Sequence, residues 1–364
     1  MWIIIGSLWL VLMAIVALML ALPETASVSD ARDALAENDV FSLAGTAVER
    51  YDVLGHTLVY HERQGLSLMD ALGREQSYIA YPYRQSRVLD AGSGRMVAPA
   101  QGAGFFAIAP DHTSWEVASK ETVNGAAYGY GRWLTFGPSS LNRTVASVYD
   151  PPNEAPILTV MCPPKTWPVR AAWVTRDTFD LLLLDLSSGE PISRLIRYDR
   201  EGEPMLDRLY DGTELYAGLA YADGDLMFLY SDRAIVALDR DSGERRAAWT
   251  LDTITRVADV AGRLVFSGDV NGQRGLYLTP SSSDETAMSM RPLAHGADVR
   301  CFDMSQDGSL LLAATDAHFL IYDIPSGDII ARQPLETAPT RILALSDRVF
   351  MVFYDDVGGV VTVR

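Results

Sequence analysis

Residues 299–334 read VRCFDMSQDGSLLLAATDAHFLIYDIPSGDIIARQP, and they contain four short apolar runs separated by turn-forming residues. The runs are VRCFDM, SLLLAAT, HFLIYDI and DIIARQP, and Ser-Gln-Asp-Gly, Asp-Ala and Pro-Ser-Gly separate them. Runs of this length, bounded by Gly, Pro, Asp and Ser, are typical of β-strands joined by tight turns. The stretch therefore predicts a four-stranded up-and-down sheet. Residues 214–251 predict another, with strands ELYAGLAY, DLMFLYS, AIVALDR and RRAAWTL.

A turn pattern, Asp-x-x-Ser-Gly, recurs after apolar strands at Asp90–Gly94, Asp185–Gly189, Asp239–Gly243 and Asp323–Gly327. The intervals between copies fit one or two units of about 40–50 residues, the length of a β-propeller blade. Weaker copies are expected in the longer intervals, at SVYDPPNEA (Ser147–Ala155) and LYLTPSSSD (Leu276–Asp284). In such a turn Asp accepts hydrogen bonds from the turn's N–H groups, and Gly takes the positive-φ position. We therefore predict one structural turn per blade and no catalytic role for Asp90, Gly94, Asp185, Gly189, Asp239, Gly243, Asp323 and Gly327.

The C-terminal residues 340–363 give three strands, TRILALS, RVFMVFYD and GVVTV, so the last blade needs a fourth. We expect Ser42–Asp52, SLAGTAVERYD, to supply it, because a strand borrowed from the N-terminal side closes the ring and covers its open edges. The predicted fold is an all-β β-propeller over residues 42–364, with about seven four-stranded blades. Eight blades are the alternative.

Residues 295–327, HGADVRCFDMSQDGSLLLAATDAHFLIYDIPSG, resemble a WD40 blade. His295 precedes the first strand, Asp316 precedes the third, and Tyr322-Asp323 stands where that family has Trp-Asp. The resemblance implies that His295, Asp316 and Tyr322 form a structural hydrogen-bonded network within the blade. It differs from the family pattern in having Ala294 before the histidine and Tyr in place of Trp.

Residues 233–249, RAIVALDRDSGERRAAW, are similar to a quinoprotein-like (PQQ-type) blade. Ser242 replaces the family's Thr, and Trp249 comes two residues later than that family's docking tryptophan. The resemblance implies propeller architecture. It does not imply a quinone cofactor, because no adjacent-cysteine pair or metal-ligand cluster accompanies it.

Residues 1–22, MWIIIGSLWLVLMAIVALMLAL, are uncharged, with Ser7 as the only polar side chain. As a helix they would span roughly 33 Å, enough to cross a bilayer. We predict an uncleaved transmembrane anchor; a cleaved signal peptide, which has a basic start and a shorter apolar stretch, is the alternative. Residues 23–41 are predicted to be a linker with a short helix at Ser29–Asp39. The acidic flank after the anchor favours export, and arginine far outnumbers lysine, so we expect a single-pass bacterial inner-membrane protein with its C-terminal domain in the periplasm.

The formal net charge is −17, and no basic stretch occurs. Nucleic-acid binding needs an electropositive surface, so we exclude a nucleic-acid partner. Cys162 and Cys301 are far apart, and no Cys-x-x-Cys occurs. Both a disulfide between them and two buried thiols remain open.

The sequence contains no Gly-x-Ser-x-Gly and no phosphate-binding loop, so we predict no catalytic residues, no cofactor and no metal site. His56 and His61 would lie on opposite faces of a strand, and residues 111–114, DHTS, are interpreted as a polar turn. Aromatic residues beside Gly, Pro and Arg are candidates for a protein interface; these are Tyr81, Tyr83, Tyr128, Tyr130 and Trp133.

The leading functional hypothesis is a membrane-anchored, exported β-propeller that acts as a protein–protein interaction module. It would serve as an accessory or assembly subunit of a larger membrane complex, with membrane or periplasmic proteins as partners. The alternatives place a function in the central channel, either as a sensor for a small ligand or as a hydrolase or oxidoreductase. An enzyme predicts inward carboxylates or histidines with shifted pKa values, whereas a channel of small and apolar side chains would contradict it.

Overall fold

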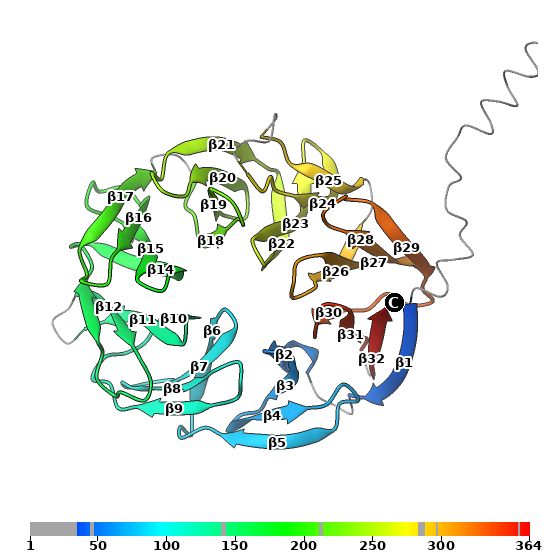
Figure 1. Ribbon diagram of the computed structural model, residues 1–364, viewed down its shortest axis with the longest axis horizontal. Helices are drawn as coiled ribbons and strands as arrows, with labels where there is room; N and C mark the ends of the chain where they lie inside the picture. The colour runs from blue at the N-terminus through cyan, green and yellow to red at the C-terminus, as the bar shows by residue number, and fades with distance from the viewer. Residues whose placement is uncertain are drawn as a thin grey trace, which may run out of the picture.

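The computed structural model describes residues 35–43, 47–139, 143–210, 214–282, 288–295, 298–355 and 357–364. Its strands form eight antiparallel sheets of four strands each, arranged as a ring (Figure 1). The fold is therefore the predicted all-β propeller. The expectation of seven blades is wrong, and the alternative of eight is confirmed.

The first four blades follow the chain from the innermost strand outward. Blade 1 contains β2 (Tyr51–Leu54), β3 (Thr57–His61), β4 (Gly65–Met69) and β5 (Glu75–Ala80). Blade 2 contains β6 (Ser86–Ala91), β7 (Gly94–Pro99), β8 (Phe105–Ile108) and β9 (Ser114–Val117). Blade 3 contains β10 (Gly125–Gly129), β11 (Arg132–Pro138), β12 (Thr144–Tyr149) and β13 (Leu158–Met161). Blade 4 contains β14 (Thr166–Thr175), β15 (Thr178–Asp185), β16 (Ile192–Tyr198) and β17 (Pro204–Tyr210).

The next three blades repeat this order, and the eighth joins the two ends of the ring. Blade 5 contains β18 (Gly218–Tyr221), β19 (Leu226–Tyr230), β20 (Ala234–Asp239) and β21 (Arg245–Thr250). Blade 6 contains β22 (Thr253–Val260), β23 (Arg263–Val270), β24 (Gln273–Leu278) and β25 (Arg291–His295). Blade 7 contains β26 (Val299–Met304), β27 (Leu310–Thr315), β28 (His318–Asp323) and β29 (Ile329–Pro334). Blade 8 contains β30 (Arg341–Ala344), β31 (Val349–Phe353), β32 (Val357–Val363) and β1 (Leu35–Ser42).

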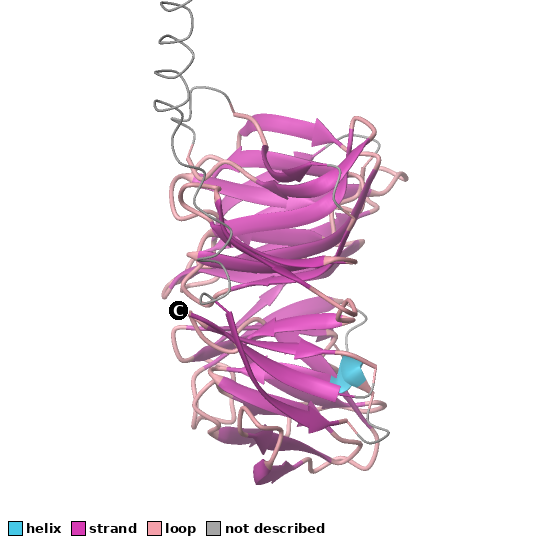
Figure 2. Cartoon of the chain, turned by 90° about the vertical axis from the view of Figure 1, so that its right-hand side faces the viewer, coloured by secondary structure: helices cyan, strands magenta, loops and turns pink. Residues whose placement is uncertain are grey.

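The strands predicted for residues 299–334, 214–251 and 340–363 all occur, and the ends of most differ from prediction by one or two residues. The larger shift is at residues 214–221, where β18 begins only at Gly218. Among the described residues one short helix occurs, η2 (Val48–Arg50), visible in the side view of the ring in Figure 2. No helix in the described ranges is long and apolar enough to cross a membrane.

An N-terminal strand closes the ring, as expected, but it is not Ser42–Asp52. β1 pairs antiparallel with β32, from Leu35 opposite Val363 to Ser42 opposite Val357. It is the outermost strand of blade 8 and lies beside the C-terminus (Figure 1). Residues 35–39 are therefore a strand and not part of the predicted helix at Ser29–Asp39. The rest of that helix and the predicted anchor lie outside the described residues.

The core lies between neighbouring sheets, because alternate side chains of a strand point to opposite faces. In β27, Leu311 and Ala313 pack in the cluster shared with blade 6. Leu312 and Ala314 pack in the cluster shared with blade 8. Each blade is thus apolar on both faces, which explains why its strands appear in the sequence as nearly continuous apolar runs.

The repeated turns do not all occupy the same place in a blade. Asp239 and Asp323 end the third strands of blades 5 and 7, and both weaker copies also follow third strands. Asp185, however, ends the second strand of blade 4, and Asp90 lies in the first hairpin of blade 2. The intervals from Asp90 to Asp185 and from Asp185 to Asp239 are therefore not multiples of the blade length.

Local geometry at these turns follows the expected chemistry, with one difference. Asp239 accepts hydrogen bonds from the backbone N–H and the hydroxyl of Ser242, at 2.8 and 2.9 Å. Gly189, Gly243 and Gly327 have positive φ. In the first copy the positive φ belongs to Gly92 and not to Gly94, because Gly94 already begins β7.

The antiparallel order gives the ring two distinct faces. The linking face carries the connections between blades and the turns between second and third strands. The hairpin face carries the turns between first and second and between third and fourth strands. β1 begins on the hairpin face and ends on the linking face, because it runs antiparallel to β32.

Candidate functional site: the central channel

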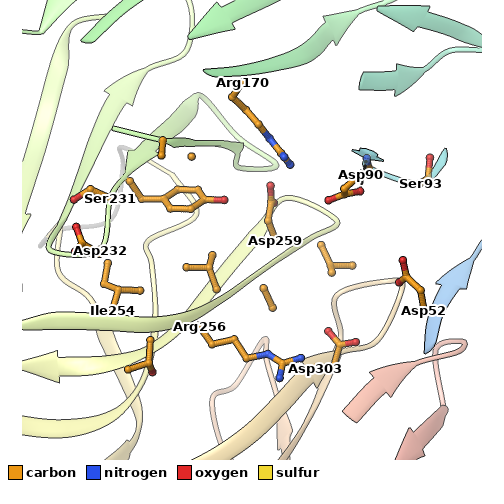
Figure 3. Close-up of a pocket in the computed structure, with 18 of the residues that line it drawn as sticks. Asp52, Asp90, Ser93, Arg170, Ser231, Asp232, Ile254, Arg256, Asp259 and Asp303 are labelled. Atoms are coloured by element: carbon orange, nitrogen blue, oxygen red, sulfur yellow. Dashed lines mark hydrogen bonds between the residues drawn. The ribbon is translucent and has the colours of Figure 1, made fainter. Parts of the chain in front are cut away.

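A cavity of about 1130 Å³ lies at the centre of the ring. Most of its lining comes from the inner strands of several blades, and it includes eight charged side chains (Figure 3). They are Asp52, Asp90, Arg95, Arg170, Asp232, Arg256, Asp259 and Asp303. The channel is therefore not lined only by small and apolar residues, which was the condition that would have contradicted an enzyme site in the channel.

Asp52 and Arg95 form a structural tie between blades 1 and 2. Arg95 Nε donates to Asp52 Oδ2 at 2.7 Å, and its other nitrogens donate to the carbonyls of Val53, Gly92 and Gly94. Burial opposes ionisation of Asp52, but the hydrogen bond to His61 and the charge of Arg95 outweigh it and lower its pKa to about 2. The guanidinium of Arg95 is fully engaged with the protein.

Asp303, from β26 of blade 7, also lines the channel and is held by backbone donors. It accepts hydrogen bonds from the N–H groups of Met304 and Ala344, at 3.0 and 2.8 Å. Burial nevertheless raises its pKa. Arg256 lies over the Phe302 ring, 5.6 Å from the centroid. The Arg256 side chain has no hydrogen bond or ion pair to the described part of the chain.

A second, largely buried network joins blades 4 and 5. Arg197 donates two hydrogen bonds to the carboxylate of Asp180, at 2.8 and 2.9 Å, and the Tyr221 hydroxyl donates a third at 2.7 Å. Burial raises the pKa of Tyr221. We did not predict this network; its only signal in the sequence is a single Asp inside the apolar strand TFDLLLLD.

Asp259, Arg170 and Tyr230 differ from both networks, because none of their side chains has a hydrogen bond or ion pair to the described residues. Arg170 and Asp259 point toward one another across the cavity (Figure 3). Asp259 is exposed to the channel, but enclosure within the ring raises its pKa to about 7, and Arg170 acts in the opposite direction.

The candidate interface aromatics are divided between core and surface. Trp133 and Tyr81 are buried, at 2% and 7% exposure, so they belong to the core and not to an interface. Tyr83 and Tyr128 are half-buried, and the Tyr128 ring packs against Trp133. Only Tyr130, at 57% exposure, is freely accessible.

The WD40-like network is not seen as the resemblance implies. Asp316 forms an exposed ion pair with Arg300, at 2.7 Å. The Tyr322 ring is fully buried, but its hydroxyl has no partner in the described residues. His295 ends β25, and its side chain lies outside what the structure describes.

No group of three or more potential metal ligands occurs within the described ranges. Cys162 and Cys301 are buried free thiols in different core clusters. Of the two sulfur arrangements left open by the sequence, the structure has the unpaired one.

A surface not predicted from the sequence lies on the linking face between blades 3 and 4. Met161, Trp167 and Val169 are exposed by 50%, 48% and 40%. Trp167 also borders a groove of about 330 Å³ that contains Phe136 and Arg143. We call Met161, Trp167 and Val169 the Trp167 surface.

No family model matches the chain, and no similar sequence was found among curated proteins. Solved structures share its fold. BamB from Moraxella catarrhalis aligns over 90% of this chain and 99% of its own, with 14% identity and a TM-score of 0.54. The WD40 domain of SCAP from fission yeast aligns over 90% and 95%, with 13% identity and a TM-score of 0.48. The chain is thus similar in fold to the BamB propeller.

Proposed function

We propose that this protein is a membrane-anchored, exported β-propeller that acts as a protein-interaction module, as an accessory or assembly subunit of a larger membrane complex. Its setting would be the bacterial inner membrane, with the ring in the periplasm. The observation that carries the proposal is the Trp167 surface, where three large apolar side chains are exposed within nine residues of sequence. Exposed aromatic and methionine side chains next to a groove are enriched at protein interfaces.

The position of β1 supports tethering in a defined orientation. If residues 1–22 span the bilayer, residues 23–34 alone separate the membrane from β1, and they reach at most roughly 40 Å when extended. The chain would enter the ring at its outer rim, on the hairpin face. The Trp167 surface lies on the opposite, linking face, so the tether leaves it open to a partner.

Site-specific photocrosslinking in native membranes tests this proposal. A photoreactive amino acid at position 167 should crosslink a discrete membrane or periplasmic protein. The matched control is position 330, because Ile330 has similar exposure, 51%, but lies on the outer strand of blade 7. Equal crosslinking from both positions, or none from position 167, would contradict the proposed interaction surface.

The charged channel favours a second candidate function, the binding of a small ligand. Arg170 and Arg256 have no ion pair in the described structure, and a channel serving only as a structural core would be expected to pair such groups. Asp259 and Asp303, whose pKa values are raised, are also the kind of carboxyl groups that an enzyme would need. No nucleophile with an adjacent base accompanies them among the described residues, so binding is better supported than catalysis.

A further inference from the structure

Two cavities meet at one point inside the ring, and unpaired polar groups mark that point. The central cavity adjoins a smaller one of about 360 Å³, and Gly92, Arg170 and Asp259 line both. Tyr230 lines the central cavity. The three polar side chains come from three consecutive blades: Arg170 from β14, Tyr230 from β19 and Asp259 from β22.

The lack of partners at this point contrasts with the rest of the interior. Arg95 and Arg197 each donate several hydrogen bonds to carboxylates and carbonyls. Arg170 donates none to the described residues, although a guanidinium has five N–H donors. A β-bulge between Pro168 and Arg170 shifts the strand register at this residue. Bulges redirect side chains and are common beside functional sites.

We call the point where the two cavities meet, with Arg170, Tyr230 and Asp259, the junction. Its charge state suits an anionic group. Burial raises the pKa of Tyr230. The charge of Arg170 lowers it, and the charges of Asp259 and Asp90 raise it further. Asp90 is itself bonded to Arg95 at 3.3 Å. With the pKa of Asp259 at about 7, a large fraction of this carboxyl is protonated near neutral pH. The junction then presents three kinds of donor: a guanidinium, a phenol and a carboxylic acid.

The smaller cavity beyond the junction combines apolar and polar walls. Its walls include Ala127, Tyr128, Ala172, Trp173 and Leu219. A ligand that enters it would place an apolar group against these side chains and leave a polar end at Arg170. Small-ligand sites commonly combine apolar walls with polar groups that orient the ligand.

We propose that the junction binds a carboxylate with an apolar body. The carboxylate would accept hydrogen bonds from Arg170, Tyr230 and Asp259, and the apolar body would occupy the smaller cavity. A planar carboxylate matches the guanidinium fork, and its single charge suits a channel that already holds several aspartates. Two sources share this chemistry: the free C-terminus of a polypeptide with an apolar last residue, and a small apolar carboxylic acid.

This inference rests on the second candidate function, ligand binding in the channel, and gives that function a site and a ligand class. It does not depend on the membrane anchor or on the Trp167 surface. Crosslinking at position 167 and ligand binding in the channel can therefore fail independently.

Calorimetric titration of the full-length protein in nanodiscs tests the proposal, with empty nanodiscs as the blank. The probes are acetyl-Ala-Leu-Phe with a free C-terminus, the same peptide as its C-terminal amide, and 4-phenylbutyrate. Binding of the peptide acid but not of the amide identifies a polypeptide C-terminus. Binding of phenylbutyrate alone identifies a small carboxylic acid. No binding of either acid, or equal binding of the amide, overturns the proposal.

Variants assign the binding to the junction. Arg170→Gln should weaken binding about ten- to a hundredfold, because a charge-assisted hydrogen bond is lost. Tyr230→Phe removes only the hydroxyl and should weaken binding by a smaller factor. Asp232→Asn changes another exposed acid of the same channel and should have no effect. Unchanged affinity in both Arg170→Gln and Tyr230→Phe would overturn the assignment, and the second variant keeps the test valid if the first does not fold.

The pH profile provides a readout that a structural role would not affect. Native affinity should fall as pH rises through about 7, because ionised Asp259 repels the carboxylate. Asp259→Asn keeps a neutral donor and should bind with an affinity that is flat between pH 6 and 8. A profile identical to that of the native protein would overturn the role given to Asp259.

Discussion

Removing the carboxylate of Asp180 should strongly destabilise the ring, because it leaves a buried cation without its partner. Asp180 is fully buried and Arg197 is 6% exposed. Asp180→Ala removes the acceptor of two hydrogen bonds from Arg197 and one from Tyr221. Arg197 keeps only the Arg240 carbonyl and a long contact to the Met227 sulfur. Breaking a buried pair in this way costs about 3–5 kcal/mol.

A double variant separates the loss of the pair from the loss of packing. Replacing both partners with apolar side chains, Asp180→Leu with Arg197→Met, removes the charge and its desolvation together. We expect the double variant to be more stable than Asp180→Ala. Urea unfolding followed by tryptophan fluorescence measures the free energy of unfolding of both.

An exposed ion pair provides the control. Arg274 and Asp298 lie 3.4 Å apart and are both more than half exposed, so Asp298→Asn should change stability by less than about 1 kcal/mol. The reasoning is refuted if Asp180→Ala costs no more than this control. It is also refuted if the double variant is as unstable as the sum of its single changes.

Three further outcomes follow from the described geometry. The folded-state pKa of Asp52, about 2, lies below its unfolded value. Its stabilisation is therefore present above about pH 4 and lost as pH falls toward 2. In Asp52→Asn the free energy of unfolding should fall by about 2 kcal/mol less over this pH window than in the native protein, as measured by urea unfolding at each pH. A Cβ at Gly137 would lie 1.8 Å from a backbone oxygen, whereas one at Gly359 would meet only a side chain at 3.5 Å. Gly137→Ala should thus lower the thermal midpoint, and an equal effect of Gly359→Ala would contradict this steric argument. Burial raises the pKa of Cys162 to about 12 and of Cys301 to about 11, so a thiol reagent at pH 8 should label neither until the protein unfolds; rapid labelling of the native protein would refute their burial.

Most strands could be predicted from the sequence, because each blade is apolar on both faces and bounded by turn residues. β26 to β29 match the predicted boundaries within about one residue. The closing strand could not be predicted. LAENDVFS contains four consecutive residues that are poor strand formers, Ala-Glu-Asn-Asp, and its pairing with β32 comes from tertiary structure and not from local preference.

The channel could be predicted only as a location. Arg170 and Asp259 lie in different blades, and their proximity depends on the ring's curvature and on a bulge that no sequence pattern marks. The prediction of an aromatic interface was wrong for Trp133 for a related reason. Tyr130 lies between two glycines and Trp133 follows Arg132, but Trp133 points into the core whereas Tyr130 lies in a positive-φ turn.

The pairing of β1 with β32 also bears on how the protein is made. The first described strand can find its partner only after β32 has left the ribosome. Until then seven sheets can form in order, while blade 8 remains incomplete and its edge open. Contacts between residues so distant in sequence slow folding, and an unpaired edge invites association with other chains. The ring can thus close only once β32 has emerged, and a chain truncated before β32 should be the form most prone to aggregation.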